Sequence, residues 1–216
     1  MSESESILRG HFRDLPQQRA TATLGMWIFM ATEIMFFGGL FLTYTVNRAA
    51  YPGIFAEASH HLNVVLGTVN TAVLICSSMT MAMAVYCSHK GRQKALSIYL
   101  ILTMILGLGF LGIKAAEWTE HFQHHLVPGF NFQFSPAAAA GPAQLYFSLY
   151  FAMTGMHALH MIIGLGILTF LLIESFRARY TPEYNTPVEL SGIYWHFVDI
   201  IWIYLFPLLY LIDIHK

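Results

Sequence analysis

Five long apolar stretches constrain this chain more than any other feature of its sequence. A helix that crosses a hydrocarbon core of about 30 Å needs about 20 consecutive apolar residues. Backbone polar groups must be satisfied inside the lipid, and these runs are continuous rather than alternating, so we expect helices and not the strands of a barrel. The spans are placed near residues 24–46, 63–88, 95–118, 143–176 and 191–213. The sequence therefore predicts an all-α integral membrane bundle of five transmembrane helices.

The composition supports a protein whose surface mostly faces lipid. Of the 216 residues, 56% are hydrophobic and 11% are charged, whereas an average soluble domain carries about 25% charged residues. Residues 1–23 form a polar N-terminal arm, in which we expect no cleavable signal peptide, and residues 24–216 form a single membrane domain without a repeat. The net charge of −1 argues against binding of nucleic acid.

Lysine and arginine are unevenly distributed between the two sides of the predicted bundle. Eight lie in the arm and in the second and fourth connections, and two lie on the opposite side. The eight are Arg9, Arg13, Arg19, Lys90, Arg92, Lys94, Arg177 and Arg179, and the two are Arg48 and Lys216. Because basic loops stay in the cytoplasm, we predict an N-terminus inside and a C-terminus outside.

Several ionisable residues lie inside the predicted spans, where an isolated charge costs about 2.5–3.5 kcal/mol on insertion scales. They are Glu33, Lys114, Glu117, His157, His160, His196 and Asp199. Glu33 should face the bundle, where it either makes one interhelical hydrogen bond or takes part in proton movement or lipid contact. Lys114 and Glu117 are expected to pair or to extend toward the membrane interface.

Two pairs of these residues share a helix face because they are three residues apart. His157 and His160 could ligate a metal, but no third ligand lies near them, so interhelical hydrogen bonding is the favoured interpretation. His196 and Asp199 could act together, since a carboxylate can orient an imidazole. A satisfied polar patch between helices is the favoured interpretation. A cluster at His121, His124 and His125 is weak evidence for a metal, and solvation is expected there.

Motifs for soluble chemistry are absent from the sequence. There is no phosphate-binding glycine loop, no CxxC or CxxCH motif and no G-x-S-x-G elbow. A membrane b-type cytochrome, with His157 or His160 opposite His196 around a haem, remains one alternative. A free-standing proton or solute transporter remains another.

In its polar context the chain resembles subunit III of the haem–copper terminal oxidases, in the five-span bacterial form. The most specific pieces are FAMTGMHALHMIIG at residues 151–164 and YWHFVDIIWIYLF at residues 194–206. Weaker pieces are ATEIMFF around Glu33, GFLGIKAAEW around Glu117, and GTVNTAVLICSSMTMA. Mitochondrial members of the family have seven spans, and this chain lacks the first two.

The resemblance implies an accessory, non-catalytic subunit of a proton-translocating oxidoreductase in the bacterial inner membrane. Members of the family bind no metal or haem, and they pack beside catalytic subunit I, which holds the haems and copper. They bind phospholipid, support proton uptake and protect the catalytic subunit during turnover. By position, Glu33 matches the family's carbodiimide-reactive acid, and His157, His160, His196 and Asp199 fall at its characteristic polar positions. An equivalent subunit of a nitric oxide reductase is the alternative within this class.

Overall fold

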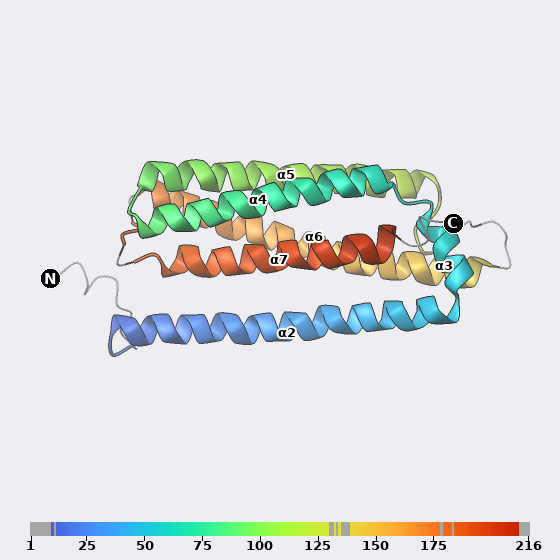
Figure 1. Ribbon diagram of the computed structural model, residues 1–216, viewed down its shortest axis with the longest axis horizontal. Coiled ribbons are helices and arrows are strands. Elements are labelled where there is room, and N and C mark those ends of the chain that lie inside the picture. The colour runs from blue at the N-terminus through green and yellow to red at the C-terminus, as the bar shows by residue number, and fades with distance from the viewer. Residues whose placement is uncertain are drawn as a thin grey trace.

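The computed structural model describes residues 10, 12–129, 132, 134, 139–177, 179–182 and 184–211. These residues form six helices (Figure 1), namely α2 (Leu15–Ala50), α3 (Pro52–Ser59), α4 (Val64–His89), α5 (Gln93–Gln123), α6 (Ala140–Phe176) and α7 (Thr186–Tyr210). All except the short α3 are long and apolar enough to cross a membrane. The prediction of an all-α chain with five spans is confirmed.

The helices extend beyond several of the predicted spans. α2 begins at Leu15 rather than near residue 24, because Asp14 caps it: the Asp14 side chain accepts a hydrogen bond from the backbone N–H of Gln17 at 2.8 Å. Residues 15–23 of the predicted arm are therefore helical, whereas residues 1–9 and 11 lie outside the described residues, as does the predicted end of the last span at residue 213. The helix α3 was not predicted.

The four helices α4, α5, α6 and α7 form the body of the bundle, and α2 stands at its edge (Figure 1). α7 contacts α2, α4 and α6, while α5 packs on α4 and α6. Accordingly α7 is the most buried of the five spans and α2 is the least buried. The last span in sequence is thus central to the fold.

Trp195 of α7 joins four helices at one point. Its indole lies so close to Gly107 of α5 and Gly164 of α6 that a Cβ added at either glycine would be 2.9 Å from the ring. Its Nε1–H donates to Ser77 Oγ of α4 at 3.0 Å. Small residues allow this close approach, and van der Waals contact and interhelical hydrogen bonds replace the hydrophobic effect as the force between helices in lipid.

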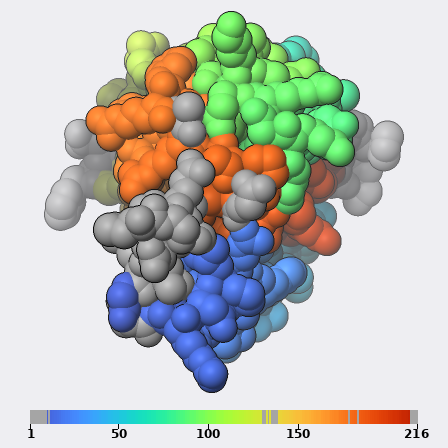
Figure 2. Space-filling view, turned by 90° about the vertical axis from the view of Figure 1, so that its left-hand side faces the viewer, coloured from blue at the N-terminus to red at the C-terminus, as the bar shows by residue number. Residues whose placement is uncertain are grey.

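One end of the bundle carries the start of α2, the α4–α5 connection and the α6–α7 connection, and we call it the basic end (Figure 1). Figure 2 looks onto this end, with α2 in blue, the α4–α5 connection in green and the α6–α7 connection in orange. Gly91 makes the tight α4–α5 turn with φ of +65°, a conformation that glycine adopts without steric cost. The described basic residues there are Arg13, Arg19, Lys90, Arg92, Lys94, Arg177 and Arg179.

Candidate functional site

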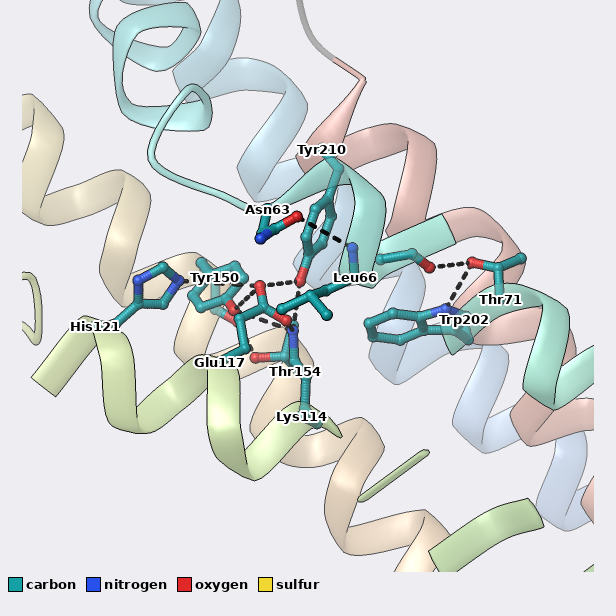
Figure 3. Close-up of polar contacts among 11 residues, drawn as sticks. Asn63, Leu66, Thr71, Lys114, Glu117, His121, Tyr150, Thr154, Trp202 and Tyr210 are labelled. Atoms are coloured by element: carbon teal, nitrogen blue, oxygen red, sulfur yellow. Dashed lines mark hydrogen bonds and ion pairs between the residues drawn. The ribbon is translucent and has the colours of Figure 1, made fainter. Parts of the chain in front are cut away.

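The largest buried polar cluster joins α5, α6 and α7 in the half of the bundle away from the basic end. Lys114 and Glu117 are 2% and 1% exposed, and Lys114 Nζ lies 3.1 Å from Glu117 Oε2. The Lys114 ammonium also donates to the hydroxyls of Tyr150, at 3.0 Å, and Tyr210, at 2.5 Å. Both hydroxyls donate in turn to Glu117 Oε1, at 2.9 and 2.5 Å. Figure 3 shows the four side chains converging.

This cluster is a closed circuit of hydrogen bonds. The three N–H donors of Lys114 meet three acceptors, and each tyrosine hydroxyl both accepts from Lys114 and donates to Glu117. The ammonium also lies 5.1 Å from the centre of the Trp202 ring, a favourable cation–π distance. The two residues pair, as expected, but Lys114 does not extend to the interface. The pair thus joins α5 to α6 and α7 through the hydroxyls of Tyr150 and Tyr210.

His121 is buried at the end of α5, contrary to the expectation that it lies solvated in a loop. It is 2% exposed, its Nε2 is 4.0 Å from Glu117 Oε1, and its ring packs against Tyr150. His121 therefore belongs to the buried cluster. It can do so since α5 continues to Gln123 instead of ending near residue 118.

Glu33 and His160 link the edge helix α2 to α6. Glu33 Oε2 lies 3.1 Å from His160 Nε2, and the two side chains are 18% and 10% exposed. The other ring nitrogen of His160 contacts the Met156 carbonyl oxygen at 2.7 Å. Glu33 thus faces the bundle and has a polar partner.

His157 does not make the expected interhelical hydrogen bond. Neither ring nitrogen has a hydrogen-bond partner among the described residues, and the ring packs between Phe110 and Trp202 at centroid distances of 5.4 and 5.3 Å. His157 and His160 therefore do not converge on one ligand. Nor do the described residues contain a group of three or more His, Cys, Asp or Glu placed to hold a metal ion.

His196 and Asp199 line a groove between α4 and α7 with a volume of about 430 Å³. His196 Nδ1 lies 2.6 Å from Ser78 Oγ. Asp199 interacts with the same serine, although neither of its carboxylate oxygens has a hydrogen bond of good geometry among the described residues. The acid does not contact the histidine directly. The two residues meet at Ser78 of α4, and this polar patch satisfies the histidine better than the acid.

A fourth acid, Glu174, lies at the end of α6 that belongs to the basic end. It is buried and accepts hydrogen bonds from Arg177 at 2.9 Å and from Arg179 at 2.6 Å. The hydrogen bond to Glu174 raises the pKa of Arg179 above its ordinary value. The sequence interpretation did not single out Glu174, Tyr150, Tyr210 or Ser78. The two tyrosines could have been found by counting depth, since each lies in the half of its span away from the basic end, as Lys114 does.

The class defined by this architecture is a multi-pass helical membrane protein whose intramembrane polar groups mostly satisfy one another across helices. The sequence profile of the family described as "Cytochrome c oxidase subunit III" matches residues 3–213. The chain belongs to this family.

Curated relatives support the same assignment. The "Quinol oxidase subunit 3" of Bacillus subtilis is 33% identical, covering 88% of this chain and 87% of the relative. The "Probable cytochrome c oxidase subunit 3" of Nocardia farcinica is 35% identical with the same coverage. The "Cytochrome c oxidase subunit 3" of Corynebacterium diphtheriae is 34% identical over 88% of each chain.

Proposed function

We propose that this chain is the accessory subunit III of a bacterial haem–copper terminal oxidase, carries no redox centre, and stabilises the catalytic subunit. Membership of the family supports the assignment to an oxidase complex. The closed hydrogen-bond circuit of Lys114, Glu117, Tyr150 and Tyr210 supports a structural role. The charges of Lys114 and Glu117 are hydrogen-bonded to each other and to tyrosines of neighbouring helices. A scaffold requires this arrangement, whereas a reaction centre needs groups left open toward a substrate.

The basic end is proposed to face the cytoplasm of the bacterial inner membrane. Its arginines and lysines would then contact anionic phospholipid head groups, each of which attracts a nearby basic side chain by about 1 kcal/mol. The Glu33–His160 pair, whose side chains are 18% and 10% exposed, is the candidate for a role in proton uptake, because of all the spans α2 is the least covered by its neighbours.

The cytochrome alternative is not supported by the histidine geometry. A bis-histidine haem needs two imidazoles that face one cavity. His157 is enclosed by Phe110 and Trp202, and His196 lines the groove between α4 and α7. Neither arrangement presents two histidines to a shared space.

Purification in mild detergent tests the proposed function. The tagged chain is expected to co-purify with a larger haem–copper protein, identified by mass spectrometry and by its visible absorbance. The chain separated from that protein is expected to show no Soret band. A Soret band from the separated chain would contradict the proposal, as would proton or solute flux after reconstitution of the chain alone.

Glu33→Gln is expected to leave assembly intact and to change turnover modestly. The amide keeps a hydrogen bond to His160, so the loss of stability should not exceed about 1 kcal/mol. Oxygen consumption and subunit content of the purified complex measure the two effects. Glu57→Gln, at an exposed position on α3, is the matched control, and loss of the complex in the Glu33 variant alone would refute a role limited to proton uptake.

A further inference from the structure

The groove between α4 and α7 contains a buried acid for which this chain supplies one shared serine and no counter-charge. Asp199 is 2% exposed, and neither of its carboxylate oxygens has a hydrogen bond of good geometry among the described residues. The side chain that interacts with its carboxyl group is Ser78, whose Oγ already contacts His196 Nδ1 at 2.6 Å. The other buried acids have basic partners within the chain. Glu117 is bound by Lys114 and two tyrosines, and Glu174 is bound by two arginines. Burying a carboxyl group with one shared hydroxyl as its partner is costly, so Asp199 points to a further group supplied from outside the chain.

The depth of the groove decides what kind of group can reach it. Ser78 lies 11 residues before the end of α4, and Asp199 lies 11 residues before the end of α7. At 1.5 Å per residue this is about 16 Å from the nearer helix end, close to the middle of a hydrocarbon core of about 30 Å. A phospholipid head group stays at the interface and does not reach this depth. A side chain on a transmembrane helix does.

The shape of the groove also fits a helix. On α4 it runs from Leu74 to Ala82, two helical turns or about 12 Å. Its rim is made of exposed apolar side chains, among which Met79 is 71% exposed and Ile200 is 49% exposed. A row of side chains on a partner helix packs into such a groove, and the small Ala82 and Ser78 permit a close approach.

We propose that this groove docks a transmembrane helix of another subunit, which places one hydrogen-bond-donating side chain against Asp199. The inference rests on the proposed function, because that function supplies membrane partners. His196, held by Ser78 at 2.6 Å, stands beside the acid and gives the incoming side chain a second polar contact. The occupant is thus a helix with a lysine, arginine, amide or hydroxyl side chain at mid-membrane depth.

Photo-crosslinking from the groove tests this proposal in the assembled complex. A benzophenone amino acid replaces Met79, and the full chain is expressed with its natural partners and irradiated in native membranes. We expect a covalent adduct with a membrane subunit. The same probe at Ile105, which is 59% exposed on α5, is the matched control and should give lipid adducts alone. Lipid adducts alone from position 79, or the same subunit adduct from both positions, would overturn the proposal.

Variants of Asp199 and of Ala82, which both line the groove, make the test specific. Asp199→Leu is expected to lower the yield of the position-79 adduct about fivefold, the effect of one lost interhelical hydrogen bond. Asp199→Asn, which can still accept a hydrogen bond, should retain the adduct. Ala82→Trp should fill the groove and abolish the adduct, whereas Ala31→Trp, also at an exposed alanine but on α2, should not. Equal yields from the leucine and asparagine variants would overturn the role of Asp199.

Failure of this proposal is distinguishable from failure of the proposed function. If the chain co-purifies with a haem–copper protein but position 79 gives lipid adducts alone, the groove is not the docking site and the function stands. If the chain co-purifies with no haem–copper protein, the proposed function itself is wrong.

Discussion

Lys114→Met is expected to destabilise the protein by about 3 kcal/mol, the lower end of the range for breaking a buried ion pair. The variant leaves Glu117, which is 1% exposed, without its counter-charge in the bundle. The effect stays at the lower end because Tyr150 and Tyr210 still donate to Glu117 Oε1. Thermal unfolding of the solubilised complex and the amount of the chain in membranes are the measurements.

A double variant separates the unpaired charge from the lost packing. Lys114→Met combined with Glu117→Leu removes both charges, and apolar replacement of a whole buried pair is often neutral or stabilising. We therefore expect the double variant to be more stable than the single variant, with a coupling energy that a double-mutant cycle measures. Lys94→Met, at an exposed position on the basic end, should have almost no effect. A single Lys114 variant as stable as the wild type would show that the circuit does not hold the helices.

Gly164→Leu is expected to be the second strongly destabilising change, by about 3 kcal/mol, the upper end of the range for overpacking. A Cβ at this position would be 2.9 Å from the Trp195 ring. The ring cannot easily retreat, because another of its edges contacts Gly107 and its Nε1–H is bonded to Ser77. The α6–α7 contact must therefore open.

Gly166→Leu is the matched control on the same helix. It makes the same chemical change two residues away, where nothing lies within 4 Å of the added Cβ. Leucine favours the helix over glycine, so this variant should be as stable as the wild type or slightly more stable. Thermal unfolding compares the two, and equal destabilisation would mean that helix chemistry, not the contact with Trp195, sets the result.

The spans could be predicted from sequence because apolar length is a local property. The hydrogen-bond partners of the polar residues could not be predicted, because they depend on which face each helix turns toward its neighbours. Glu33 was expected to find a polar partner, but only the packing of α2 against α6 selects His160. His157 is also a histidine and lies three residues before His160 on α6. Its ring nevertheless packs against Phe110 and Trp202 instead of a polar group.

Helix ends differ from the predicted span ends because they depend on capping and on packing against other helices. The polarity of residues 1–23 indicates an arm, but the backbone N–H of Gln17 donates a hydrogen bond to the Asp14 side chain, and α2 begins there. Similarly, His121 was expected in a loop because the third span was placed at residues 95–118. Its burial against Tyr150 depends on α6, which no local pattern in α5 reports.

The central position of α7 has a consequence for the order in which the protein is made. Translation delivers this helix after the other four spans, yet it carries Trp195, Trp202, Tyr194 and Tyr210, whose side chains bond to α4, α5 and α6. A nascent chain with four spans inserted lacks the Tyr210 hydroxyl that bonds to Lys114 and Glu117, and it lacks the Trp195 ring that Gly107 and Gly164 approach. The contacts that close the bundle can therefore form only after α7 has entered the membrane.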